Sequence, residues 1–315
     1  MFKKRSTLSK YWLKYTNRRK YKEYKWEQVN YAQFQYTNFM LGENRMTDIT
    51  KIKATAEKNG RLTLTHSGNA GDIIYALATI KRIHEITNVP VHLYLKLGQK
   101  TNLRYYNNHP LGGVMMNEKM ASMLKPLLVS QTYIASCENY SNEEIDIDLD
   151  YFRTGLIPQD RGNIGHWVGY ITGVTPQLWK NWLTVVKKQE AAEYILIARS
   201  ARYQNQTIDY SFISQYQNLK FIGVESEFNE MKKMLPSIEW LQVGNFLDLA
   251  QIIAGCKFFI GNQSFPYSLA EALKAPRILE VCFEVINVIP EGENGYDFFF
   301  QEHFEWLVKD LSGNN

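Results

Sequence analysis

From residue 61 onward, short apolar runs alternate with longer segments in which apolar residues recur at helical spacing. The short runs predict strands, and the periodic segments predict helices. In the first part of the chain the predicted strands are 62–65, 91–95 and 132–135, and the predicted helices are 72–85, 117–130 and 164–172. Strands that alternate with helices are typical of a parallel sheet covered on both faces.

The alternation begins again after a polar joint at 187–192. The remaining predicted strands are 194–198, 219–223, 257–261 and 277–281, and the helices are 227–234, 247–254, 266–273 and 298–308. We therefore expect an α/β fold with two Rossmann-like domains that face each other across a cleft. The expected domains are 60–188 and 189–315, with ligands bound at the carboxyl ends of the strands.

Residues 1–59 form a basic, aromatic N-terminal extension ahead of these domains. Its first 27 residues hold ten Lys or Arg against two Glu, a net charge of +8, whereas the whole chain carries +4. Leu8, Tyr11, Trp12 and Tyr15 fall at helical spacing among these cations. Three interpretations stay open: packing on the protein or a partner, which we favour, then peripheral contact with anionic lipid, and last a nucleic-acid arm.

Composition excludes several classes of protein. Hydrophobic residues make up 45% of the 315 residues, which excludes a wholly disordered chain. No apolar stretch approaches the roughly 20 residues that cross a bilayer, and the N-terminus lacks the apolar middle of a secretory signal. The three cysteines show no CxxC spacing, so we expect a cytoplasmic protein without disulfides or structural zinc.

The first candidate site is the turn after the strand at 62–65. Gly68 and Gly71 allow close approach of the backbone to a ligand, and the helix that follows Asn69 offers free N–H groups to an anion. Asp72 suits a general base, although a carboxylate at a helix start is also an ordinary cap. His66 could assist Asp72 or donate to a phosphate, and a lone histidine is equally an ordinary polar residue.

Two further candidates follow strands of the second domain. Asn262, Gln263 and Ser264 form a polar turn before a helix, and Glu271 on that helix could accept hydrogen bonds from a ribose. Arg199 and Arg202 follow the strand 194–198, where guanidinium groups suit a phosphate. Taken alone, each of these groups is equally explained as a helix cap or as surface charge.

A competing motif is the alternating run Asp146, Asp148 and Asp150. Side chains alternate along a strand, so the three carboxylates would share a face and could hold Mg²⁺ or Mn²⁺. We favour an exposed strand end instead, because paired αβ halves argue against a metal-using, single-domain enzyme. No metal site is expected.

The segment 68–83, a Gly-Asp followed by an aliphatic helix, resembles the N-terminal signature of the heptosyltransferase-like glycosyltransferases. The segment 261–276 is similar to the nucleotide-sugar end of their second domain, and the likeness spans about residues 60–310. The resemblance implies a GT-B glycosyltransferase that is metal-independent, usually inverting, and uses a nucleotide-diphosphate sugar as co-substrate with no other cofactor. Asp72 then matches the base, Arg199 or Arg202 faces the diphosphate, and Glu271 holds the ribose.

The second motif departs from the family, whose Asp-Thr-Gly reads Gln263-Ser264-Phe265 here and whose following histidine is Ser268. We expect sugar transfer to a hydroxyl acceptor that the sequence does not identify. The alternative is a catalytically inactive GT-B-like scaffold or binding protein that works through its basic N-terminal arm. A nucleotide-sugar epimerase on the same frame is a third hypothesis. If residues 1–27 contact lipid, the protein lies at the inner face of the membrane.

Overall fold

We describe the protein from a computed structural model, which covers residues 2–42, 45–100, 112–153, 157 and 159–313. Contacts divide the chain into two compact units, residues 1–46 and 47–315. No helix in the described ranges is long and apolar enough to cross a membrane.

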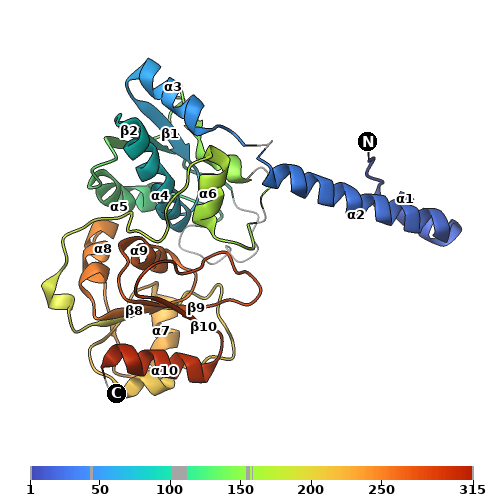
Figure 1. Cartoon of the computed structure of the whole chain (residues 1–315). Coiled ribbons are helices and arrows are strands. Elements are labelled where there is room, and N and C mark those ends of the chain that lie inside the picture. Colours follow the sequence, from blue (N-terminus) through green and yellow to red (C-terminus); the bar gives the residue numbers. More distant parts are fainter. Residues whose placement is uncertain (1, 43–44, 101–111, 154–156, 158, 314–315) are drawn as a thin grey trace. The chain divides into compact units, whose positions relative to one another are not determined.

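The first unit is a pair of helices, α1 (Thr7–Thr16) and α2 (Arg18–Met40), which pack against each other (Figure 1). Ser6 caps α1 by accepting a hydrogen bond from the Ser9 N–H, and the chain turns at Asn17. Among the side chains that the structure describes in this unit, the buried hydrophobic ones are Leu13 and Tyr24. The hairpin therefore buries little apolar surface, and most of its aromatic side chains stay exposed.

The second unit begins with α3 (Ile49–Asn59) and a four-stranded parallel sheet in the order β3-β2-β1-β4. Its strands are β1 (Leu62–His66), β2 (Val91–Leu95), β3 (Ser136–Asn139) and β4 (Ile147–Asp148). The helices α4 (Ala70–Thr87), α5 (Glu118–Val129) and α6 (Ile164–Thr172) accompany it. All five residues of β1 are buried, as expected for the central part of a parallel sheet.

The remaining strands form a six-stranded parallel sheet in the order β10-β9-β8-β5-β6-β7. Its strands are β5 (Ile195–Ala198), β6 (Leu219–Phe221), β7 (Glu239–Trp240), β8 (Phe258–Gly261), β9 (Arg277–Glu280) and β10 (Gly295–Phe298). The helices are α7 (Glu225–Met234), α8 (Phe246–Gly255), α9 (Phe265–Leu273) and α10 (Gln301–Ser312). A buried apolar core spans β5, β6, β8 and α10. Two parallel sheets with flanking helices confirm the predicted α/β class.

Two details differ from the sequence-based predictions. The strand predicted at 132–135 lies at Ser136–Asn139, where a polar edge strand pairs with β2. The extension expected to reach residue 59 ends earlier, because α3 buries Ile52 and Ala56 against β1 and α4. Both sheets belong to one compact unit, so the division at residue 188 stays a prediction.

The two sheets are joined by direct packing of their helices. Helix α4 packs against α9, and α5 packs against α8. Trp182 lies buried between them, with its indole N–H donating to the Ile74 carbonyl at 2.7 Å and its own carbonyl accepting from the Tyr133 hydroxyl at 2.6 Å. Trp182 therefore packs between the helices that join the two sheets.

Candidate functional site

The loops that follow β1 and β8 meet where α4 packs against α9. A side chain added at Gly71 would lie 3.7 Å from the Phe265 backbone and 3.8 Å from the Ser268 hydroxyl. The first and second sequence motifs, almost 200 residues apart, are therefore neighbours in space. Because both loops follow parallel strands, this junction is where ligands bind in open α/β folds.

The turn after β1 is packed tightly around its first glycine. Gly68 donates its backbone N–H to the His66 Nδ1 at 2.9 Å. A side chain at Gly68 would come within 3 Å of atoms of Arg153, His66 and Asp72. A larger residue at this position would displace these three side chains, so glycine leaves the space that they occupy. The role of Gly68 in shaping the acceptor side of the loop stays a prediction.

His66 is buried, with 1% of its surface exposed, so its ring does not face a substrate in solvent. Burial, followed by the charge of Arg153, lowers its pKa to about 3. The ring is therefore neutral at pH 7, and Nδ1 is the acceptor for the Gly68 N–H, so the proton resides on Nε2. This geometry favours a positioning role for His66 over proton transfer to or from a substrate.

Asp72 lies in the first turn of α4 and is bound from two sides. Its Oδ2 accepts a hydrogen bond from the Asn69 N–H at 3.2 Å and forms an ion pair with Arg153. Both side chains are about one fifth exposed, so the carboxylate is reachable from solvent. The cap role and a chemical role are thus compatible for Asp72, since the cap uses one oxygen.

Arg153 connects Asp72 to a wider network at the strand ends. Its guanidinium lies 3.5 Å from Asp150, which also accepts the Ser67 N–H at 2.8 Å. Lys96, directly after β2, pairs with Asp148 at 2.9 Å and approaches Asp150 at 3.8 Å. The carboxyl ends of β1, β2 and β4 thus carry alternating charges that hold Asp72 in place.

The three carboxylates of the Asp146–Asp150 run go to separate partners. Asp146 accepts hydrogen bonds from the Thr63 N–H and hydroxyl at 2.8 and 2.9 Å, whereas Asp148 and Asp150 belong to the charged network. Within the described ranges, no group of three or more potential metal ligands comes together.

On the second sheet, Asn262 holds the loop after β5. Its amide nitrogen donates to the carbonyls of Ser200 and Arg202 at 2.9 and 2.7 Å, and its oxygen accepts from the Ser200 N–H at 3.0 Å. The side chain is fully buried. Asn262 was predicted to bind the donor, but in this structure it organises the loop that carries Arg202.

The two arginines after β5 have different environments. Arg199 is buried in a bidentate ion pair with Glu280, at 2.7 and 2.9 Å, and donates to the Asn205 carbonyl. Burial opposes its charge, but Glu280 more than compensates and raises the pKa of Arg199. The predicted diphosphate role is corrected for Arg199, because its charge is already neutralised. Arg202 is half-buried, with its guanidinium 4.6 Å from the Tyr203 ring centroid.

Glu271 does not face a ligand. Its side chain is 1% exposed, and its two oxygens pair with Lys274 and Arg277, both at 2.5 Å. Oε1 also accepts the Glu291 N–H at 3.1 Å. The ribose role predicted from sequence is therefore corrected: Glu271 neutralises two cations inside the second half.

The turn before α9 contains two buried polar side-chain atoms that have no hydrogen-bond partner in the described part of the chain. These are the Ser264 hydroxyl and the Gln263 Oε1, while the Gln263 amide nitrogen donates to Asn287 at 2.6 Å. Ser264 is the N-cap of α9, and Gln263 is buried. Both atoms are buried at the start of α9, where the Phe265 backbone and the Ser268 hydroxyl adjoin Gly71.

Sequence reasoning missed Arg153, Lys96 and Glu280 as organisers of these loops. Arg153 follows the two-residue strand β4, which is too short to produce a periodic pattern. Lys96 and Glu280 stand at the ends of β2 and β9, and that position was the available signal.

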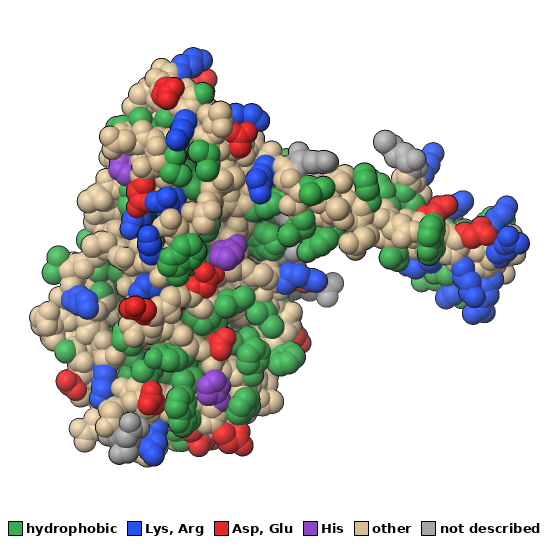
Figure 2. Space-filling model, in the orientation of Figure 1, with side chains coloured by type: hydrophobic (Ala, Val, Ile, Leu, Met, Phe, Trp, Pro, Cys, Tyr) green, Lys and Arg blue, Asp and Glu red, His purple; other side chains and the backbone are tan. Residues whose placement is uncertain are grey.

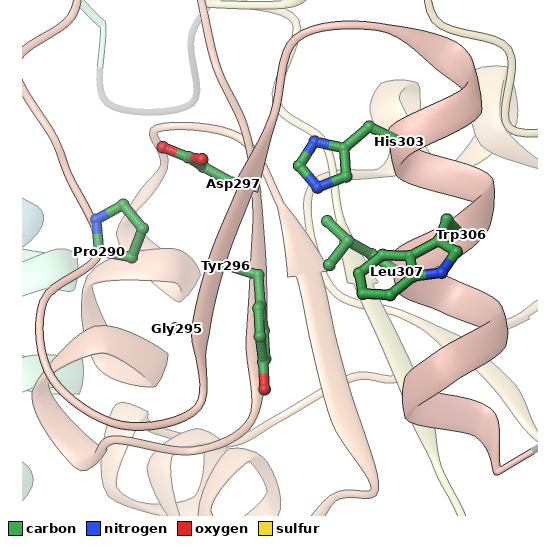
Figure 3. A pocket seen from close by; sticks show the side chains of 7 residues that line it. All are labelled: Pro290, Gly295, Tyr296, Asp297, His303, Trp306 and Leu307. Carbon is green, nitrogen blue, oxygen red and sulfur yellow. The ribbon is translucent and has the colours of Figure 1, made fainter.

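A cavity of about 310 Å³ lies away from this junction, between β10 and α10 (Figure 3). Tyr296 and Asp297 from β10 and His303 and Trp306 from α10 line it. It contains none of the predicted site residues. We place the candidate site at the loop junction because strand ends, polar turn atoms and the Asp72 network meet there.

No protein-family model and no curated protein sequence matches the chain. Solved structures do match. E. coli heptosyltransferase WaaC with ADP-2-deoxy-2-fluoro heptose aligns with a TM-score of 0.53 at 10% identity, over 79% of this chain and 99% of that chain. A glycosyl transferase family 9 protein from Veillonella parvula aligns with a TM-score of 0.49 at 9% identity, over 81% and 89% of the two chains. This chain therefore has the heptosyltransferase-like, GT-B fold that the sequence predicted.

Proposed function

We propose that this protein is a glycosyltransferase that moves a sugar from a nucleotide-diphosphate sugar to a hydroxyl acceptor. The observation that carries the proposal is the junction of the β1–α4 and β8–α9 loops in a heptosyltransferase-like fold. Asp72 lies in the first turn of α4 directly after Gly71, and Gly71 lies against the N-terminal turn of α9. A general base and an anion-binding helix end are the two elements that such a reaction requires.

In the proposed reaction, Asp72 takes the proton of the acceptor hydroxyl. The acceptor oxygen then bonds to the anomeric carbon from the face opposite the leaving group. The bond between that carbon and the diphosphate oxygen breaks, and the nucleoside diphosphate leaves, so the configuration inverts. Asn69 and Arg153 hold the Asp72 carboxylate in place, and Gly68 and Gly71 shape the acceptor side of the loop.

The developing charge on the diphosphate needs donors that are already oriented. We propose that the start of α9 supplies them through the Ser264 hydroxyl, which has no partner among the described residues and can donate to a diphosphate oxygen. The unpaired Gln263 Oε1 is an acceptor, so it does not contribute to binding the anion. Arg202 is the cation that we assign to the diphosphate, on a loop held by Asn262. The proposal uses no metal ion.

E. coli WaaC is solved with ADP-2-deoxy-2-fluoro heptose, which supports a nucleotide sugar as the donor class. We propose further that the protein is cytoplasmic and contacts the inner face of a membrane through residues 1–27. That contact would bring the junction to acceptors held at a bilayer surface.

One observation favours a second candidate, an inactive scaffold that kept the fold. The resemblance matches Arg199 and Glu271 to donor-binding residues, but both form buried ion pairs within the protein. Arg199 pairs with Glu280, and Glu271 pairs with Lys274 and Arg277. A protein without a donor site would then work through its basic arm.

Thermal-shift measurements with a panel of nucleoside diphosphates and nucleotide sugars separate the two candidates. A ligand that binds only the native state raises stability by RT ln(1 + [L]/Kd), about 2.7 kcal/mol at a hundredfold excess over Kd. We expect one nucleotide to raise the melting temperature by several degrees, at about 2–4 °C per kcal/mol. A flat response across the panel at millimolar ligand would favour the scaffold.

A further inference from the structure

The helical hairpin exposes an apolar stripe that it does not cover itself. On α1, the exposed fractions are 83% for Leu8, 56% for Tyr11, 66% for Trp12 and 77% for Tyr15. Their spacing of three, four and seven residues places all four on one face of the helix. Contiguous exposed apolar surface of this kind marks a site of interaction.

The opposite face of α1 is already used to hold the hairpin together. Leu13 is buried on the side that packs on α2, and Tyr24 of α2 is buried beside the N-terminal segment. The Arg5 N–H donates to the Tyr24 hydroxyl at 3.2 Å, and the Phe2 ring stacks on the Tyr24 ring at a centroid distance of 5.4 Å. The four exposed side chains of the stripe are therefore not needed to hold the two helices of the hairpin together.

Charge identifies the kind of surface that the stripe would meet. Helix α1 carries Lys10 and Lys14 and no acidic residue, and both acidic residues of the first 27, Glu23 and Glu27, lie on α2. Figure 2 shows Lys and Arg side chains gathered at the end of the helical arm. The cations that follow α1 within the first 27 residues are Arg18, Arg19, Lys20, Lys22 and Lys25.

We infer that α1 lies along the surface of an anionic lipid bilayer and inserts its Leu8–Tyr11–Trp12–Tyr15 stripe at the headgroup boundary. The inference rests on the membrane contact proposed above and names the face that makes it. Tryptophan and tyrosine settle at this boundary, while neighbouring cations bind anionic headgroups. A helix of ten residues is about 15 Å long, half the thickness of the hydrocarbon core, so it lies on the bilayer.

The hairpin contains a matched control for this face. Trp26 on α2 is 70% exposed, similar to Trp12, but it lies two residues from the buried Tyr24 and so projects away from α1.

The test is flotation of the full chain with vesicles of equal parts phosphatidylglycerol and phosphatidylcholine. We expect Trp12→Ala to lower the partition coefficient about tenfold, because a buried aromatic ring is lost, and Trp26→Ala to change it less than about twofold.

Tyr15→Ala should weaken binding as Trp12→Ala does, with unchanged circular dichroism, and pure phosphatidylcholine vesicles should not bind the wild type. Equal vesicle binding by Trp12→Ala and the wild type would show that the exposed face of α1 does not insert, while leaving the proposed membrane contact of residues 1–27 intact. No flotation of the wild type overturns both. Tight binding to a single-stranded RNA oligonucleotide without vesicle binding would assign the stripe to nucleic acid instead.

Discussion

Asp72→Asn should abolish most sugar transfer, lowering the rate by about 10²–10⁴-fold, while leaving donor binding intact. An amide cannot take the acceptor proton, so only the loss of general-base catalysis is expected. The fold should survive, because the asparagine oxygen can still accept the Asn69 N–H and Arg153 keeps Asp150 as a partner. The measurement is the rate of nucleoside diphosphate release beside the dissociation constant of the donor.

Asp150→Asn is the matched control for this prediction. It removes a carboxylate from the same Arg153 network but leaves Asp72 unchanged. We expect its transfer rate to fall by much less than that of Asp72→Asn. If both variants lost activity equally, the network as a whole and not Asp72 would be responsible, and near-normal transfer by Asp72→Asn would remove it as the base.

Glu271→Ala should destabilise the folded protein by about 3–5 kcal/mol, because it leaves buried cations without their partner. Arg277 is fully buried, and its guanidinium also donates to the carbonyls of Ala275, Glu291 and Glu293. Burial lowers the pKa of Lys274 to about 8, so this side chain can lose its proton at modest cost. Arg277 cannot, and it therefore carries most of the penalty. Urea unfolding measures the change.

Glu271→Gln keeps the shape and one acceptor oxygen, and we expect a smaller loss of stability than for alanine. A loss below about 1 kcal/mol in Glu271→Ala, combined with weakened nucleotide binding, would contradict the buried ion cluster. That result would return Glu271 to the ribose role suggested by the sequence.

Helices and strands could be predicted from the sequence wherever a segment carries a continuous or periodic set of apolar residues that it buries. The helix predicted at 164–172 is α6 as observed, and the apolar run at 194–198 became β5 with one residue fewer. Strands without such a pattern were missed. Residues 136–139 read Ser-Cys-Glu-Asn and form β3 only because β2 offers an open edge, which is a tertiary effect.

The position of the candidate site could be predicted from the sequence, but the contacts and roles of its side chains could not. Gly68, Asn69 and Asp72 follow a strand, and the strand-end rule places them at the junction. Whether an arginine or glutamate at such a place faces a ligand depends on partners distant in sequence. Glu280 neutralises Arg199 although the two are 81 residues apart in sequence, and no local sequence pattern predicts that pair.

Calorimetric titration of the best-binding nucleoside diphosphate into two variants of Ser264 tests whether the diphosphate binds at the start of α9. Aspartate and asparagine have nearly the same shape and both suit an N-cap, so each should keep α9 intact. Only Ser264→Asp places a negative charge where we propose that the diphosphate binds. We expect at least about tenfold weaker binding to Ser264→Asp than to Ser264→Asn, a difference of about 1.4 kcal/mol. Equal affinities would show that the nucleotide does not bind at the start of α9.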